Sequence, residues 1–245
     1  MKKLLLMAFL AVGMAANAET FLTDKGDDSK TVGGIDLGEG QDENDRWTMH
    51  IAVGVDIPTS VPSGMEFAPF RSWDINFTLI QYDYTPKNWK TTFSAGLGFD
   101  WRNYTLSGHD KAFVKVPANP TAGIANDFVE VSTPNLKSDD RSSRIQTLSL
   151  SMPLLIKQRF SKLFALSLGA QVNWNFRGHL HNYYEDGDSE ISTDTKKIGQ
   201  RPFTVDILGI VHVERFGIYC KYSPMSVMKT DRGPEFKSLS VGVYF

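Results

Sequence analysis

Two histidines separated by one residue, His179 and His181, are the clearest candidates for metal chemistry in this 245-residue chain. Alternate residues of an extended segment point to the same side, so both imidazoles could face one ion, with Glu185 and Asp186 nearby. Imidazole and carboxylate groups are common ligands of zinc and related metals. No third ligand accompanies the pair at a defined spacing, and a solvated loop explains the same residues. We therefore assign no metal site and expect no cofactor.

A second group of residues could serve a hydrolase acting on lipid A. Such an enzyme needs a nucleophile beside a base that a third group holds in place. His109 lies beside Ser107 and Asp110, while Ser142 and Ser143 begin a later segment. Closeness in sequence is weak evidence, because catalytic triads are recognised by their geometry. We assign no catalytic residue and expect a non-enzymatic protein. The alternative is an outer-leaflet lipid-modifying enzyme, similar to a lipid A deacylase or acyltransferase.

A third group consists of ionisable residues that all fall on the polar side of their segments. One interpretation is a proton or ion path, and the other is a paired network that fills an interior, since buried charges must be paired to offset their desolvation. An interior too narrow for an open channel favours the filling network. The residues are His50, Arg102, Arg177, Asp206, His212, Glu214 and Lys221.

The elements that must position these side chains are β-strands. Apolar and polar residues alternate with a period of two, which indicates strands with one apolar face. The pattern is clearest between Phe164 and Arg177 and in the C-terminal segment FKSLSVGVYF, which ends on Phe245. We predict eight strands, at 47–57, 72–84, 89–104, 143–157, 164–177, 202–214, 216–226 and 236–245.

The connections between these segments alternate between short and long. Tight turns follow the second, fourth and sixth strands, and longer connections, including 105–142, follow the others. Outer-membrane barrels alternate short periplasmic turns with longer external loops. We therefore predict an all-β fold, an eight-stranded antiparallel up-and-down transmembrane β-barrel, with both termini in the periplasm and the C-terminal strand closing on the first. External loops on a rigid barrel are where binding is expected.

The rival architecture is a soluble, lipocalin-like ligand carrier with its apolar face inward. The apolar faces of the eight strands hold forty residues, many of them large. An eight-stranded barrel is only wide enough inside for a filling of side chains or one small ligand. Because forty such residues would overfill it, we expect the apolar face to point outward into lipid. The mean hydropathy of −0.24 does not oppose this, because alternating strands give no hydropathy peak.

The N-terminal region is expected to lie outside the barrel. Residues 1–18 combine Lys2 and Lys3, an apolar core and a small-residue cleavage site ending at Ala18, as in a secretory signal peptide. Residues 19–45 hold nine acidic residues and few apolar ones, which predicts a flexible acidic periplasmic leader. The barrel domain then covers 46–245. The single cysteine, Cys220, excludes a disulfide framework, and the net charge of −2 gives no reason to expect nucleic acid.

Three segments resemble the PorT-like family of small outer-membrane β-barrels, which are related in shape to OmpX and OmpA. They are Leu150–Phe160 (LSMPLLIKQRF), Gly217–Met225 (GIYCKYSPM) and the terminal Val243–Phe245 (VYF). In such proteins the first pattern is a strand containing proline that leads into a periplasmic turn, and we expect a bulge at Pro153. The resemblance implies an integral protein of the cell outer membrane that supports secretion or the envelope.

The expected partners follow from this assignment. They are outer-membrane lipid, the barrel assembly machinery acting through the C-terminal strand that ends at Phe245, and an unidentified extracellular or periplasmic protein. The resemblance supplies no active-site residues.

Overall fold

The computed structural model describes residues 35–39, 45–108, 110–133, 141–161, 163–186, 189–213 and 216–245. Within these ranges the chain is all-β, with two short 3-10 helices, η1 (Pro69–Arg71) and η2 (Pro120–Ala122). No helix in the described ranges combines the length and apolar character needed to cross a membrane. The strands are β1 (Ile35–Glu39), β2 (Asp45–Thr59), β3 (Trp73–Tyr84), β4 (Thr91–Thr105), β5 (Ala112–Val116), β6 (Phe128–Ser132), β7 (Arg141–Arg159), β8 (Phe164–Asp186), β9 (Ser189–Lys196), β10 (Phe203–Val213), β11 (Phe216–Ser223) and β12 (Lys237–Tyr244).

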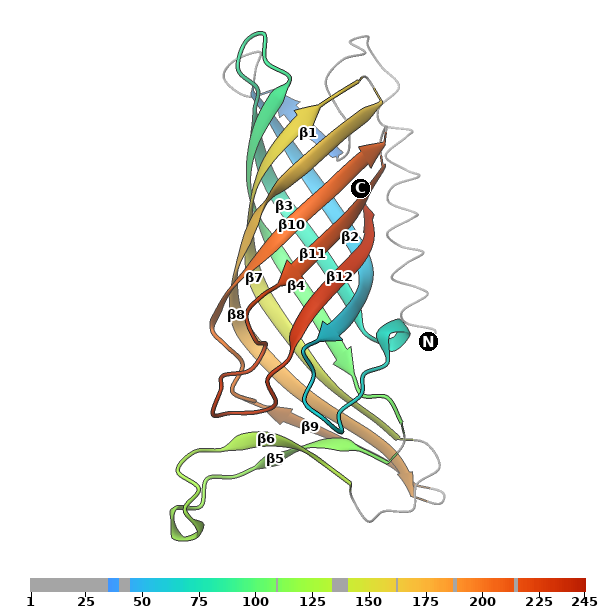
Figure 1. Ribbon diagram of the computed structural model, residues 1–245, viewed down its shortest axis with the longest axis vertical. Helices are drawn as coiled ribbons and strands as arrows, with labels where there is room; N and C mark the ends of the chain where they lie inside the picture. The colour runs from blue at the N-terminus through green and yellow to red at the C-terminus, as the bar shows by residue number, and fades with distance from the viewer. Residues whose placement is uncertain are drawn as a thin grey trace.

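The main strands pair in a closed circuit. β2 pairs with β3, and the pairing continues antiparallel through β4, β7, β8, β10, β11 and β12. β12 then pairs back with β2, with Leu239 opposite Ile57 and Tyr244 opposite Ala52. The prediction that the C-terminal strand closes on the first predicted strand is confirmed. Figure 1 shows these strands lying side by side and tilted against the long axis of the molecule.

Each of the eight predicted segments overlaps a strand of this circuit, but four further strands were not predicted. β5 pairs with β6 as a separate hairpin, and β9 folds back on the end of β8. β1 pairs with β2. The eight-strand prediction therefore missed β1, β5, β6 and β9, which lie at the two ends of the circuit. These strands are too short or too polar to show a clear alternation.

Strand β1 corrects the expectation of a flexible leader for residues 35–39. Ile35 pairs with Met49, and Glu39 pairs with Arg46. β12 reaches along β2 only as far as the contact between Phe245 and Ile51, so the remaining edge of β2 is open to another strand. Backbone donors and acceptors at such an edge favour pairing, and β1 supplies it. The signal peptide and the rest of residues 19–44 lie outside the described residues.

The predicted bulge at Pro153 is wrong. Leu154 pairs with Ala95 and Ser151 with Gly98, so the register between β4 and β7 is the same on both sides of the proline. Gly96 faces the ring of Pro153, and a Cβ atom on Gly96 would lie 3.1 Å from Pro153 Cγ. The absence of a side chain at Gly96 leaves room for the proline. Register shifts occur instead between β3 and β4, from Thr78 to Ile80, and between β7 and β8, from Leu148 to Ser149.

The short and long connections fall at opposite ends of the circuit, as predicted. β3 is joined to β4 through residues 85–90, and β7 is joined to β8 through 160–163. The longer connections carry η1, the β5–β6 hairpin and β9. In Figure 1 the C-terminus lies at the end with the turn between β3 and β4, and β5, β6 and β9 lie at the other end. We call these the turn end and the loop end.

Candidate functional site

Buried charges fill the middle of the strand circuit. Four aspartates are fully buried, together with two cations that are 6% and 1% exposed. They belong to five different strands, and in each case strand alternation turns the polar residue inward. The group consists of Asp56, Asp74, Asp100, Arg102, Asp206 and Lys221, and the predicted inward position is confirmed for Arg102, Asp206 and Lys221.

Two cations connect opposite walls of the circuit. Lys221 Nζ on β11 donates to Asp74 Oδ1 on β3 at 2.8 Å and to Asp100 Oδ1 on β4 at 3.0 Å. Arg102 on β4 donates through Nε to Asp100 Oδ2 at 2.8 Å and through Nη2 to Asp206 on β10. Because each cation contacts carboxylates from two strands, the network ties β3 and β4 to β10 and β11 across the interior.

Neutral polar side chains satisfy most of the remaining hydrogen-bonding groups of this network. Tyr219 Oη donates to Asp74 Oδ2 at 2.7 Å, and Ser223 Oγ donates to Asp206 Oδ1 at 2.6 Å. Asn173 Nδ2 also donates to Asp206, at 2.6 Å. Asp56 is the exception, because neither of its carboxylate oxygens has a hydrogen-bond partner among the described residues. The other carboxylates are held in a hydrogen-bonded core typical of buried charge.

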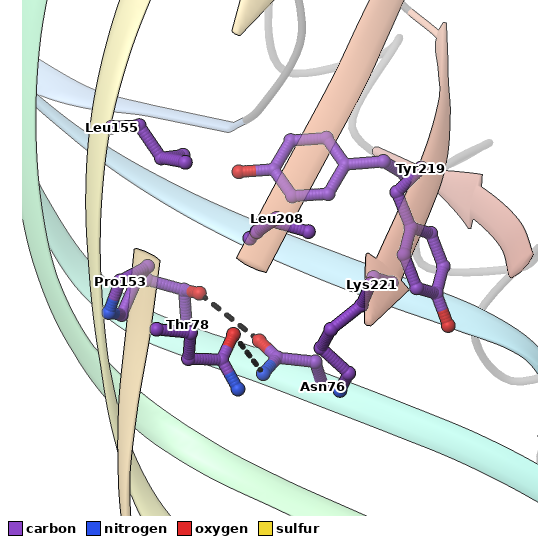
Figure 2. A pocket seen from close by; sticks show the side chains of 10 residues that line it. Asn76, Thr78, Pro153, Leu155, Leu208, Tyr219 and Lys221 are labelled. Atoms are coloured by element: carbon purple, nitrogen blue, oxygen red, sulfur yellow. Dashed lines mark hydrogen bonds between the residues drawn. The ribbon is translucent and has the colours of Figure 1, made fainter. Parts of the chain in front are cut away.

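A cavity of about 10 Å³ lies between apolar side chains on one side, including Leu155, Leu208 and Tyr219, and polar ones on the other, including Asn76 and Lys221 (Figure 2). That volume holds about one water molecule. The paired charges around this small cavity favour the interpretation as a network that fills the interior over an ion path.

The outer surface of the circuit is apolar. Large side chains that point away from the interior are exposed on the strands of the circuit, for example Ile218 at 62%, Ile207 at 58% and Leu168 at 55%. Cys220 is exposed on the same surface. A polar interior inside an apolar exterior is the reverse of a soluble ligand carrier, and an exposed apolar surface of this extent marks an interaction site.

Aromatic residues gather at both ends of this apolar surface. At the loop end, the rings of Trp73 and Trp101 meet edge to face with centroids 4.7 Å apart, and Trp174 is 49% exposed. At the turn end, Trp47 packs on Tyr82 at 5.0 Å, and Trp89 is 58% exposed. These five tryptophans therefore lie near the two ends of the strands.

An apolar cluster closes the loop end of the interior. It combines residues from circuit strands with residues from the β5–β6 hairpin and from the connection that precedes β12. Its buried members are Met65, Tyr104, Leu106, Phe113, Val129, Ile145, Leu180, Ile198, Val227, Met228 and Phe236. Phe113 is fully buried and Val129 is 2% exposed, so the hairpin contributes two side chains to this closure.

Polar contacts fix the hairpin in place. Ser143 Oγ accepts from the Phe113 amide at 2.8 Å, and Asn182 Nδ2 donates to the Phe113 carbonyl at 2.9 Å. Asp127 forms ion pairs with Lys115 at 2.8 Å and with Arg232 at 2.5 Å. Within the connection 105–142, where the sequence predicts binding, residues 112–132 thus form an anchored hairpin with an exposed tip at 117–126.

We predict that the hairpin loosens at low pH. The hydrogen bond from Lys115, with the nearby charge of Arg232, lowers the pKa of Asp127. A lowered folded-state pKa stabilises the fold above the ordinary aspartate value of about 3.9, and this contribution is lost as the pH falls through the folded-state pKa. Asp127→Asn should raise amide hydrogen exchange in 112–132 at pH 7, measured by mass spectrometry after correction for intrinsic rates.

The same experiment in acid provides the control. Below the folded-state pKa of Asp127, wild-type protein and Asp127→Asn should exchange alike in this segment, because both then lack the carboxylate. Equal exchange of the two proteins at pH 7 would show that the Asp127 ion pairs do not hold the hairpin.

The two candidate metal ligands lie in a strand and not in a loop. His179 and His181 point to the same side of β8, as predicted, but each already has a partner. Arg177 Nε donates to His179 Nε2 at 2.6 Å, and His181 Nδ1 lies 2.5 Å from Asp194 Oδ1 on β9. That hydrogen bond lowers the pKa of Asp194. No group of three or more potential ligands occurs within the described ranges.

The prediction that Arg177 points inward is wrong. The register between β7 and β8 shifts so that Leu148 pairs with Arg177 and Ser149 pairs with Asn175. Phe176 is the extra residue, and a bulge of this kind reverses the alternation. Asn175 therefore faces Ser149 on the inner side, whereas Arg177 is exposed. The other inward predictions that can be compared, for His50, Arg102, Asp206, His212 and Lys221, agree with their burial.

The candidate hydrolase base His109 lies outside the described residues, as does Glu214 of the ionisable group. Ser143 is engaged with Phe113 and Asn182. The closest hydroxyl-to-imidazole arrangement that sequence reasoning did not identify is Ser167 Oγ, 2.8 Å from His212 Nε2. Both residues are 2% exposed, and His212 Nδ1 has no partner among the described residues. A third group to orient the base is therefore missing from this pair.

Comparisons with known proteins give no family assignment. No family model matches the chain, and no curated protein matches it. Two solved structures of Ail, the attachment invasion locus protein of Yersinia pestis, are similar at 10% identity over 83% of this chain and 100% of theirs. One of them contains the heparin analogue sucrose octasulfate; the TM-scores are 0.34 and 0.33. At this level the likeness carries no argument about family or function.

Proposed function

We propose that this chain is an integral, non-enzymatic β-barrel of the outer membrane, in which the closed circuit forms eight transmembrane strands. The observation that carries the proposal is the inverted burial: charged residues fill the interior while large apolar side chains cover the outside. An apolar outer surface is stable in contact with hydrocarbon. The aromatic residues at both ends of this surface match the aromatic girdles at the two interfaces of membrane barrels. A filled interior agrees with the narrow lumen of eight strands.

The orientation that fits the connections has the turn end in the periplasm and the loop end outside the cell, because membrane barrels carry their short turns on the periplasmic side. Both ends of the barrel domain are then periplasmic. The assembly machinery would engage the C-terminal strand that ends at Phe245. A signal peptide over 1–18 and the resemblance to PorT-like barrels are consistent with this location.

The role we propose for the loop end is to present a rigid surface to an unidentified protein partner in support of the envelope or of secretion. The β5–β6 hairpin is anchored by Phe113 and by the ion pairs of Asp127. Loops held in one conformation lose less entropy on binding than flexible ones. The exposed tip at 117–126 is the part of the hairpin free to contact a partner.

The alternative of an outer-leaflet lipid-modifying enzyme makes a contrasting prediction. Replacing His109, His179 or His181 with alanine should leave the composition of cellular lipid A unchanged, because a non-enzymatic protein uses none of these histidines as a catalytic base. The measurement is mass spectrometry of lipid A from cells that carry each variant. The enzyme would be supported if lipid A from a variant lacked an acyl group that wild-type cells add, or kept one that wild-type cells remove.

The location is tested by fractionation of cells that express the full chain. We expect the protein in the outer-membrane fraction after density separation, resistant to alkaline carbonate extraction. An epitope inserted between Ala122 and Gly123, at the exposed hairpin tip, should be labelled by antibody on intact cells. Recovery in the soluble periplasmic fraction would refute the membrane location, and labelling only after lysis would refute the orientation.

A further inference from the structure

Basic side chains concentrate on the outward side of β7, β8 and β9, directly beyond the apolar surface. We define the cationic face as Arg71, Arg144, Arg177 and Lys196. Arg71, Arg177 and Lys196 are exposed and Arg144 is partly exposed. Among the described side chains that pair across this part of the sheet, one carboxylate, Asp194, accompanies them, and it is engaged with His181.

Strand register brings these residues together. Arg144 pairs with His181 of β8, and His181 pairs with Asp194 of β9. Toward the turn end the outward residues remain aligned, since His179 pairs with Lys196 and Leu148 pairs with Arg177. Neighbouring strands lie about 4.8 Å apart, so the basic groups occupy one contiguous patch.

Arg71 joins the patch from a different part of the chain. Its carbonyl accepts hydrogen bonds from Asn103 and Thr105 on β4, and its Nη2 donates to Ser142 Oγ on β7 at 3.1 Å. Thr105 pairs with Arg144. The η1 segment therefore lies against the end of β4 and sets Arg71 beside Arg144.

The bulge at Phe176 is what places Arg177 in this patch. Without the extra residue, alternation would turn Arg177 inward with Asn173 and Asn175. Bulges commonly redirect a side chain, and here the redirected group is a guanidinium at the margin of the apolar surface. Arg177 follows the exposed Trp174 by three residues, about 10 Å along the strand. At the tilt of about 45° typical of a transmembrane strand this is about 7 Å along the membrane normal, within the roughly 5–8 Å that each headgroup region adds to the hydrocarbon.

We propose that the cationic face binds the phosphorylated headgroup of an outer-leaflet lipid, whose acyl chains lie on the adjoining apolar surface. The inference rests on the proposed membrane location. A phosphate monoester suits paired guanidinium groups, which donate two parallel hydrogen bonds to its oxygens. The four cations of this face repel one another, and an anion bound between them lowers that repulsion. The aromatic side chains of Trp101 and Trp174 border the same patch on its apolar side.

The test uses the full chain folded in neutral detergent and titrated with diphosphoryl lipid A, with bound lipid counted by native mass spectrometry. Arg144→Gln with Arg177→Gln should weaken binding by at least about tenfold, because charge-assisted hydrogen bonds are lost. Lys87→Gln with Lys90→Gln removes the same charge from the turn end and should bind like wild type. Arg144→Lys with Arg177→Lys keeps the charge but loses the paired guanidinium donors. Its affinity for the lipid should lie between those of the two glutamine variants.

Three results would overturn the inference. They are equal binding by the two glutamine variants, no preference of wild type for the phosphorylated lipid over phosphatidylcholine, and full competition by inorganic phosphate at the lipid's own concentration. Each variant is first shown to be folded by its heat-dependent gel migration. If wild type itself lacks that property, the proposed membrane barrel fails, whereas a folded barrel without lipid preference refutes this inference alone.

Discussion

Replacing Lys221 with methionine is expected to lower the free energy of unfolding by about 3–5 kcal/mol, the range for breaking a buried ion pair from one side. Lys221 is 1% exposed and is the shared donor to Asp74 and Asp100. Methionine has a similar length, so little packing is lost. The variant leaves carboxylates buried with one cation, Arg102, in place of two.

The measurement is urea unfolding of the full chain in detergent, followed by gel migration of unheated samples. Lys229→Met is the matched control, because Lys229 is exposed outside the circuit and exposed substitutions change stability by about 0.5 kcal/mol or less. Similar midpoints for the two variants would show that the buried network does not hold the walls together.

Replacing Ile207 with arginine should destabilise the folded protein in lipid by about 2–4 kcal/mol, the cost of a basic residue on the lipid face near the bilayer midplane. Ile207 is 58% exposed at the middle of β10. In a water-soluble protein the same exposed position would tolerate arginine with little change. The size of the loss in stability therefore distinguishes a lipid-facing surface from a water-facing one.

The control for Ile207→Arg is Ala122→Arg, which adds the same charge at the exposed hairpin tip. We expect its stability in phospholipid vesicles, measured by urea titration, to match wild type. If Ile207→Arg also matched wild type, the apolar surface would not be in contact with hydrocarbon.

The strands of the circuit were predictable because each one shows its apolar and polar faces within its own sequence. Period-two alternation identifies strand faces without knowledge of neighbours, and the alternating connection lengths order the strands. The closure of β12 on β2 follows from the same pattern. The inward position of Asp206 and Lys221 needs only the parity of their strands.

The parts that could not be predicted depend on contacts between distant segments. β1 forms because β2 extends past the end of β12, a mismatch that no single segment reveals. The bulge at Phe176 depends on the pairing of β7 with β8, so Arg177 was assigned to the wrong side. Gly96 accommodates Pro153 from the neighbouring strand, which removes the need for the predicted bulge.

For the candidate sites, too, the sequence predicts which residues share a face but not which partners they contact. The sequence identifies His179 and His181 as neighbours on one face, but not that Arg177 and Asp194 already occupy them. It identifies charges as inward, but not which carboxylate each cation contacts. The burial of Phe113 in the apolar cluster at the loop end depends on the β5–β6 hairpin. The strands of this hairpin are five residues long and show little alternation.

The central claim is a closed circuit of strands with a charged interior and a lipid-facing exterior. It is tested most directly by electrophoresis of the full chain from detergent-extracted membranes, with and without boiling. A closed, hydrogen-bonded barrel resists detergent until it is heated, so we predict that the unheated protein migrates faster and shifts to its unfolded position after boiling. A protein that is recovered without detergent and migrates identically with and without boiling would contradict the account.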